Sequence, residues 1–150
     1  MKPSTRFAIY VVAALAAASL AVAVVAARRP AAAPERLQPG RWAVATGVNG
    51  AALGTPVSTC ISAQDALAAN GSHDDIADAA RREGAAHSCR VREVLVAGPT
   101  ITVDMVCQGQ PARSTMTYGG TRYEGTMATS IGRPNAQVIV MKGQRIGDCP

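Results

Sequence analysis

Aromatic residues are scarce in this 150-residue chain, where one Trp, three Tyr and one Phe make up 3% of the total. Two of the five rings, Phe7 and Tyr10, lie within the first ten residues. The remaining rings are Trp42, Tyr118 and Tyr123. Proteins that bind single-stranded nucleic acid stack successive bases on several aromatic side chains. The shortage of rings therefore argues against this class of protein.

Charged residues are also few, at 17% of the chain against 48% hydrophobic residues, and this balance excludes an intrinsically disordered protein. The formal net charge is +5, but it is unevenly distributed. Residues 1–37 carry a net charge of +4, whereas residues 38–150 carry only +1. The basic character belongs to the start of the chain, so we expect no nucleic acid among the partners.

The chain lacks the short motifs of common catalytic and metal sites, including G-x-S-x-G, H-E-x-x-H, a phosphate loop and C-x-x-C. Ser72-His73-Asp74 has the residue types of a triad, but adjacent side chains point in different directions, and a helix cap is the favoured interpretation. His73, Asp74, Asp75 and His87 offer zinc or manganese ligands, although solvated residues flanking a helix explain them better. We predict no catalytic, cofactor-binding or metal-binding residue.

Phe7–Ala27 is an uninterrupted apolar run of 21 residues between basic flanks. About 20 apolar residues are enough to span a bilayer, whereas Ala21-Val22-Ala23 has the form of a signal-peptide cleavage site. Residues 1–27 are therefore predicted to be either a signal peptide or an N-terminal transmembrane helix. An uncleaved helix would contact the inner membrane through residues 7–27. Both alternatives place the rest of the chain outside the cytoplasm, in the periplasm or secreted.

Residues 28–39 are rich in Pro and Ala and predict an extended linker, which leaves residues 40–150 as the folded domain. All four cysteines lie in this domain, at Cys60, Cys89, Cys107 and Cys149. An even number of cysteines after an export signal predicts two disulfides. The bridges would compensate for a small core that is poor in aromatic residues.

Cys89–Ala97 and Thr100–Cys107 flank Gly98-Pro99 and predict an antiparallel hairpin. One register satisfies the cysteines, the apolar face and the charges together. It opposes Cys89 to Cys107, Val91 to Met105, Arg92 to Asp104 and Leu95 to Ile101. The same register leaves Glu93 on the apolar face, opposite Val103. We therefore predict a Cys89–Cys107 bridge, which leaves Cys60 to pair with Cys149.

The remaining pattern predicts a mainly β fold, with a minor helical part. Two short helices are expected at about 63–70, after a Ser62–Asp65 capping box, and at Asp75–Glu83, and their carboxylates give this insert a local negative charge. Further strands are expected at Arg41–Gly47, Val57–Ile61, Ala112–Tyr118, Tyr123–Ser130 and Gln137–Ile146. The predicted fold is an antiparallel meander of five or six strands, forming a curved sheet or a partly open barrel, with the helices inserted after strand two.

Several motifs occur in a characteristic order along residues 39–150. They are Gly40-Arg41-Trp42, Cys60-Ile61-Ser62-Ala63-Gln64-Asp65, Asp104-Met105-Val106-Cys107, the Tyr118–Met127 hairpin, and Arg145-Ile146-Gly147-Asp148-Cys149-Pro150. In this ordered set the chain resembles a bacterial family of exported proteins, domain of unknown function family 3617. The resemblance implies an exported or periplasmic bacterial protein with two disulfides, and it implies no activity.

The function expected from these features is that of a non-catalytic binding or interaction module of the cell envelope. One methionine recurs in each late strand, so a concave face rich in Met, Val and Ile would suit a small apolar ligand or an unknown envelope protein. The alternative is a structural or stress-related envelope protein with no small-molecule ligand. An enzyme is disfavoured, because it would require His73 or His87 in a cleft beside a carboxylate or serine.

Overall fold

The computed structural model describes residues 35–150. The predicted signal peptide or membrane anchor, residues 1–27, lies outside the described residues, as does most of the predicted linker, residues 28–39. Within residues 35–150 no helix is both long enough and apolar enough to cross a membrane.

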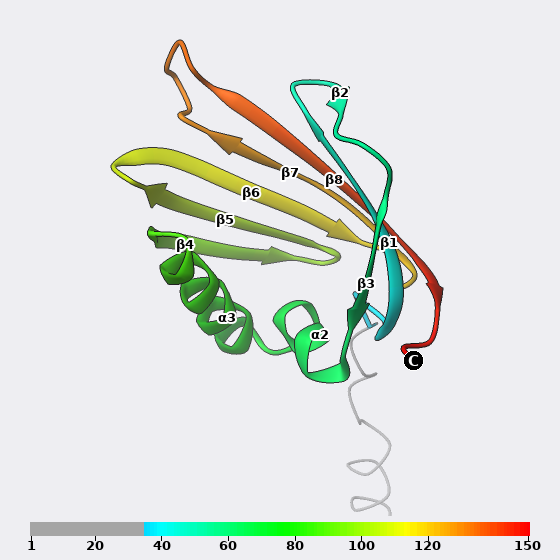
Figure 1. The fold of residues 1–150 in the computed structure, drawn as a ribbon. Helices are drawn as coiled ribbons and strands as arrows, with labels where there is room; N and C mark the ends of the chain where they lie inside the picture. Colours follow the sequence, from blue (N-terminus) through cyan, green and yellow to red (C-terminus); the bar gives the residue numbers. More distant parts are fainter. Residues whose placement is uncertain (1–34) are drawn as a thin grey trace, which may run out of the picture. The chain divides into compact units, whose positions relative to one another are not determined.

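The described part of the chain is built mainly from β-strands, with two helices between the third and fourth strands (Figure 1). The elements are β1 (Gly40–Val48), β2 (Ala51–Ala52), β3 (Val57–Ile61), α2 (Ala63–Asn70), α3 (His73–Ala86), β4 (Cys89–Ala97), β5 (Thr100–Cys107), β6 (Gln110–Tyr118), β7 (Arg122–Thr129) and β8 (Gln137–Gly147). The predicted mainly β fold with two inserted helices is confirmed. The helices follow Val57–Ile61, as predicted, and this strand is numbered β3 because the loop after β1 contains the two-residue strand β2.

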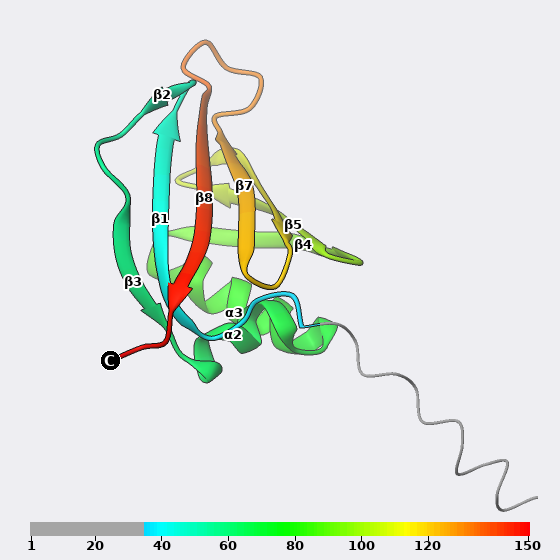
Figure 2. The same cartoon turned by 90° about the vertical axis from the view of Figure 1, so that its right-hand side faces the viewer.

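The strands form one antiparallel sheet in the order β2-β1-β8-β7-β6-β5-β4, and β3 also pairs with β1. From β4 to β8 each strand pairs with the next along the chain, which is the predicted meander, and β1 then joins β8. The sheet is strongly curved but does not close, since β4 ends one side and β2 and β3 end the other (Figure 2). The structure is therefore a curved open sheet.

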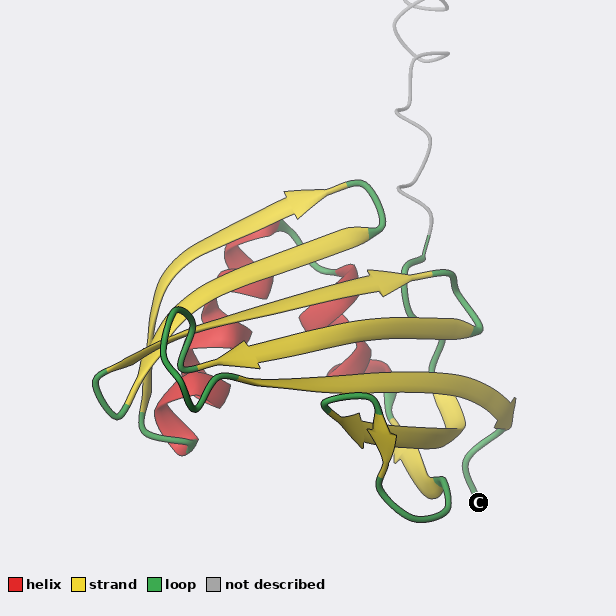
Figure 3. Cartoon of the chain, turned by 90° about the horizontal axis from the view of Figure 1, so that it is seen from above, coloured by secondary structure: helices red, strands yellow, loops and turns green. Residues whose placement is uncertain are grey.

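Both helices lie on the same face of this sheet (Figure 3). The strand register places Trp42 and Val44 on this face together with the apolar side chains of the meander. The buried cluster consists of Leu37, Trp42, Ala69, Ile76 and Ile101. Trp42 is fully buried, donates from Nε1 to the Gln38 carbonyl at 3.1 Å, and packs against Tyr123 with ring centroids 5.3 Å apart. A single large aromatic side chain therefore sits at the centre of the core.

The β4–β5 hairpin begins in the predicted register but contains a β-bulge at Arg92. Beyond the bulge Val94 opposes Val103 and Val96 opposes Ile101, whereas the prediction opposed Leu95 to Ile101. The bulge turns Leu95 outwards, with 59% of its surface exposed, and moves the charged Glu93 off the apolar face. The register predicted beyond Val91 is therefore wrong. The extra residue at the bulge places Val94 and Val96 on the apolar face and Glu93 on the opposite face.

The predicted ion pair between Arg92 and Asp104 is also wrong. Asp104 instead accepts two hydrogen bonds from Arg113 on β6, from Nε at 2.6 Å and from Nη2 at 2.9 Å. This bidentate contact lowers the pKa of Asp104. Arg113 stands directly opposite Asp104 in the β5–β6 register, whereas the bulge displaces Arg92 from that position.

Capping boxes start both helices. Ser62 and Asp65 exchange hydrogen bonds at the start of α2, as predicted, and Ser72 and Asp75 do the same at the start of α3. α3 is longer than predicted, because Gly84 does not end it. Gly84 is buried against β4, and a Cβ there would lie 3.3 Å from the carbonyl oxygen of Cys89. This glycine therefore allows a close helix–strand approach.

The folded part begins before Gly40, within the segment that was predicted as linker. Leu37 is buried, and its backbone is held from both sides by Asn70 at the end of α2. The amide of Leu37 donates to Asn70 Oδ1 at 2.9 Å, and Asn70 Nδ2 donates to the Leu37 carbonyl at 2.8 Å. Arg36 donates from Nε to the Gly98 carbonyl at 2.7 Å. Composition alone does not reveal these contacts, since their partners lie more than thirty residues away.

Candidate functional site

The four cysteines form two disulfides, Cys60–Cys149 and Cys89–Cys107, with Cα–Cα distances of 5.6 and 4.0 Å. This is the pairing that the hairpin register predicts. Cys89 and Cys107 are directly opposed where β4 starts and β5 ends. Cys60 lies in β3 and Cys149 follows β8, so the second bridge ties the C-terminal tail to the strand on the far side of β1.

The first and last motifs of the folded part meet beside this second bridge. Arg145 donates from Nε to the carbonyl of Pro39 at 2.8 Å and forms an ion pair with Asp148. Gly40 lies beneath it with a φ of +144°, and a Cβ there would come within 2.6 Å of the Gly147 carbonyl oxygen. The site accepts only glycine at this position. These motifs therefore join the two ends of the fold.

The two histidines stand apart from one another. His73 begins α3 and donates to the carbonyl of Val94 at 3.1 Å, while His87 follows the end of the helix and contacts Glu83 at 3.0 Å. The 14-residue helix between them is about 21 Å long. The alternative metal site that combines His73 with His87 is therefore not assembled. Residues 35–150 contain no cluster of three or more His, Cys, Asp or Glu side chains suited to a metal ion.

The residues of the triad-like sequence have separate roles. Ser72 caps α3 through its hydroxyl group, which accepts from the amide of Asp75 at 3.2 Å. The side chain of Asp74 is 98% exposed, and its carboxylate is 3.4 Å from His73 Nδ1. The Ser72 hydroxyl also donates to the Asp75 carboxylate at 2.7 Å. The helix-cap interpretation accounts for these contacts.

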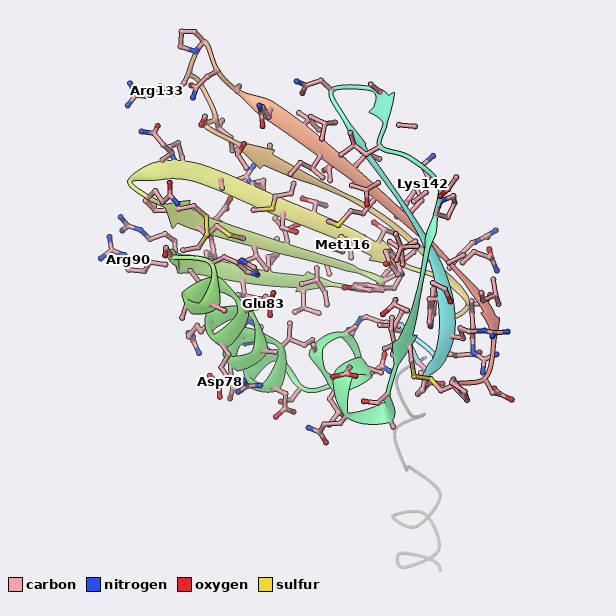
Figure 4. The ribbon with its side chains drawn as sticks, in the orientation of Figure 1. Asp78, Glu83, Arg90, Met116, Arg133 and Lys142 are labelled. Atoms are coloured by element: carbon pink, nitrogen blue, oxygen red, sulfur yellow. A yellow bond between two sulfur atoms is a disulfide. The ribbon has the colours of Figure 1, made fainter. Side chains whose placement is uncertain are left out.

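A cleft of about 770 Å³ lies between the helices and the sheet. Its floor on the sheet carries Ile101, Val103, Ser114, Met116 and Tyr118. Its walls come from both helices, with Leu67, Ala68 and Ile76 among their apolar residues. Figure 4 shows Met116 on the sheet, and Asp78 and Glu83 on α3. The cleft therefore combines a mostly apolar floor with walls that carry both apolar and charged residues.

Close packing around Gly125 shapes the floor of the cleft. Met116 on β6 stands opposite Gly125 on β7, and Gly125 in turn stands opposite Met141 on β8. A Cβ at Gly125 would collide with the sulfur of Met116, so this glycine makes room for the methionine side chain. Methionine side chains are flexible and polarisable, which lets such a floor adapt to ligands of different shape.

Tyr118, like Ser114, is a residue with a hydroxyl group on the mostly apolar floor. Burial raises the pKa of Tyr118 to about 12, so the phenol is neutral over the physiological range. The ring centroid of Tyr118 lies 6.1 Å from that of Tyr123, its cross-strand partner. Tyr118 therefore lines the cleft as an uncharged side chain at the end of β6.

Acidic side chains dominate the charge on the walls of the cleft. Four carboxylates line it, from Asp65, Asp75, Asp78 and Glu83, against one guanidinium group, from Arg82. Hydrogen bonds from Ser62 lower the pKa of Asp65, and hydrogen bonds from Ser72 lower that of Asp75. The capping boxes therefore keep both carboxylates ionised beside the apolar floor.

A second hollow, of about 730 Å³, includes side chains from the opposite face of the sheet. Its lining includes Ala43, Ala45, Thr117, Glu124 and Lys142. Glu124 and Lys142 stand directly opposite each other in the β7–β8 register, so their charges offset each other. Arg122 also lines this hollow, so its lining has a small positive bias, unlike the acidic lining of the cleft between the helices and the sheet.

A family model described as protein of unknown function (DUF3617) matches residues 37–149. The chain belongs to the DUF3617 family. The match begins at Leu37, the first buried residue of the described part of the chain, and it ends at the disulfide-bonded Cys149. No similar protein is found among the curated proteins, and none among the solved structures.

The sequence predicts only part of the cleft between the helices and the sheet. The sequence predicts a concave face rich in Met, Val and Ile, and it predicts a local negative charge on the helical insert. It did not bring the two features together, because each helical carboxylate has a local explanation as a cap or an intrahelical partner. The i, i+3 and i+7 spacing of Asp75, Asp78 and Arg82 was the available signal, since it places all three along one side of α3.

Proposed function

We propose that the protein is a non-catalytic binding module of the bacterial cell envelope, which holds a small apolar ligand between its helices and its sheet. The observation that carries this proposal is the cleft of about 770 Å³ above Ile101, Val103 and Met116. Its volume falls within the usual range for small-molecule sites, about 300–1,000 Å³. Such sites are typically lined by apolar side chains with a few polar groups, and here Ser114 and Tyr118 lie among the apolar residues of the floor.

The two disulfides support the assignment to the cell envelope. They are consistent with an oxidising location outside the cytoplasm, because cytosolic thiols are normally kept reduced. The apolar run Phe7–Ala27 supplies the export signal in this proposal, whether it is cleaved or kept as an anchor. The module then works in the periplasm, as a secreted protein, or tethered to the inner membrane.

The contacts of the two histidines support a non-catalytic role. His73 is bonded to the backbone of Val94, and His87 to Glu83 on the same helix. Neither residue lines the cleft. A general base would need to reach a substrate in the cleft within hydrogen-bonding distance.

Native mass spectrometry of the protein recovered from the envelope of its host tests the proposal. We expect a noncovalent adduct that is lost on denaturation. Ala68→Trp places a large ring at the wall of the cleft and should remove the adduct. Ala85→Trp is the matched control, because Ala85 is an exposed residue of α3 outside the cleft lining.

A bare protein in this experiment, or an adduct that survives in the Ala68→Trp variant, would contradict the proposal. Bare protein would favour the alternative, a structural or stress-related envelope protein without a small-molecule ligand. An adduct with the mass of another protein would replace the small ligand with a protein partner.

A further inference from the structure

The helical layer has a charge opposite to that of the sheet it covers. α2 and α3 carry five carboxylates and two guanidinium groups, a net charge of −3. The described residues 35–150 as a whole carry a net charge of +1. Negative charge is therefore concentrated in the helices, on one side of the cleft.

The cleft itself is amphipathic across its width. One side is the apolar floor around Ile101, Val103 and Met116, and the other side has four carboxylates against the single Arg82. An uncharged hydrocarbon would fill the floor but would gain no attraction from the excess negative charge of the walls. A fatty acid or another anionic amphiphile would place its head group against like charge, which is unfavourable.

We propose that the ligand of this cleft is a cationic amphiphile, with its hydrocarbon chain on the sheet and its ammonium or guanidinium group beside the helical carboxylates. This inference rests on the proposed function, because it names the chemical class of the ligand for the same cleft. Charge complementarity between a ligand and its site favours the matching partner and disfavours partners of the opposite sign.

Asp78 and Glu83 are the wall carboxylates best placed to report on this charge selection. Their side chains are 62% and 77% exposed. Asp78 forms an ion pair with Arg81 at 2.7 Å, and Glu83 contacts Nε2 of His87 at 3.0 Å. Neither carboxylate belongs to a capping box. Neutralising them therefore changes the charge of the cleft while leaving the helix starts intact.

Isothermal titration with three probes of equal chain length tests the inference, using the protein expressed with its own leader and recovered from the envelope. The probes are decyltrimethylammonium, 1-decanol and decanoate, each below its micellar concentration or its solubility limit. We expect decyltrimethylammonium to bind at least tenfold more tightly than decanoate at low salt. The difference should shrink as salt is added, because exposed charges are screened within about 10 Å at 0.1 M.

Matched variants separate the charge of the cleft from the overall charge of the protein. Asp78→Asn and Glu83→Gln should each weaken decyltrimethylammonium binding about threefold, the effect of a unit charge about 6 Å away in a water-like medium. The double variant should lose about tenfold. Asp74→Asn is the control, because Asp74 is an exposed carboxylate of the same helix that does not line the cleft. This variant should bind decyltrimethylammonium as tightly as the unmodified protein does.

Equal affinities for the three probes would overturn this inference and leave the proposed function standing. An equal loss in Asp74→Asn and Asp78→Asn would also overturn it, since the attraction would then belong to the whole protein. A failure of all three probes to bind would count against the proposed function as well. Circular dichroism of each variant establishes that the helices are retained.

Discussion

The Cys60–Cys149 bridge should contribute more to stability than the Cys89–Cys107 bridge. The two bridges span 89 and 18 residues of sequence. Loop-closure entropy in the unfolded chain gives about 4.6 kcal/mol for the longer loop and about 3.2 kcal/mol for the shorter one at 25 °C. Replacing both cysteines of the long loop by serine should therefore destabilise the protein by about 1.4 kcal/mol more than the same change in the short loop, a tenfold difference in the unfolding equilibrium.

The native structure reinforces this order. β3 lies beside β1 and has no partner strand on its other side in the described part of the chain, and Cys60 holds it to the C-terminal tail. Cys89 and Cys107 already face each other within a hairpin that is paired along its length except at the bulge, so we expect the hairpin to keep its backbone hydrogen bonds without the bridge.

Urea denaturation of the two double-serine variants measures both free energies of unfolding. Arg92→Ala is the control, because Arg92 is an exposed residue at the bulge, and its replacement should change stability by less than about 0.5 kcal/mol. Equal losses for the two bridges, or a larger loss for Cys89–Cys107, would refute the loop-entropy reasoning. A loss in the Arg92→Ala variant comparable to either bridge would refute the view that the disulfides dominate.

Three further predictions follow from packing and capping. Gly143→Ala should cost about 1–3 kcal/mol in a thermal melt, because the new methyl group collides with the ring of Tyr123. Asn70→Ala should cost about 1–3 kcal/mol in urea, because it leaves the donor and acceptor of a buried leucine backbone without partners. The lowered pKa values of Asp65 and Asp75 mean that their contribution is complete above the unfolded pKa of 3.8 and is lost as the pH falls through the folded values. An Asp65→Asn/Asp75→Asn variant should therefore lose less stability than the unmodified protein between about pH 5 and pH 2 when followed by circular dichroism, and parallel losses would contradict this assignment.

Because the core is small, the fold depends on disulfides and specific polar contacts for additional stability. Trp42 is the one large side chain that is fully buried among the described residues, and the remaining buried side chains are small or aliphatic. A domain of this size buries a limited fraction of its surface. The two disulfides and the contacts of Arg145 with both ends of the fold supply the additional constraint.

An open cleft is compatible with this small core. The buried cluster gathers around Trp42, Ile76 and Ile101, near the start of α3. Met116 and Val103 extend from this cluster into the cleft as half-buried residues. The helices therefore pack closely at one region of the sheet, while beside it the same face remains open to a ligand.

The sequence alone determined the features that depend on neighbouring residues. Strand alternation, the turn at Gly98-Pro99 and the first capping box are local patterns, and each forms where it was predicted. Cys89 and Cys107 lie within one hairpin, so their pairing follows from the local register. Once they are paired, two cysteines remain, and the second bridge follows by elimination.

Only the tertiary structure decided the features that depend on distant residues. The bulge at Arg92 is set by the packing of Val94 and Val96 on the shared apolar face, so the register slips by one residue and Asp104 takes Arg113 as its partner. Residues before Gly40 look like a linker in composition and become part of the domain only through contacts more than thirty residues away. The cleft arises where two helices meet a curved sheet, and neither periodicity nor spacing encodes how far apart those surfaces stand.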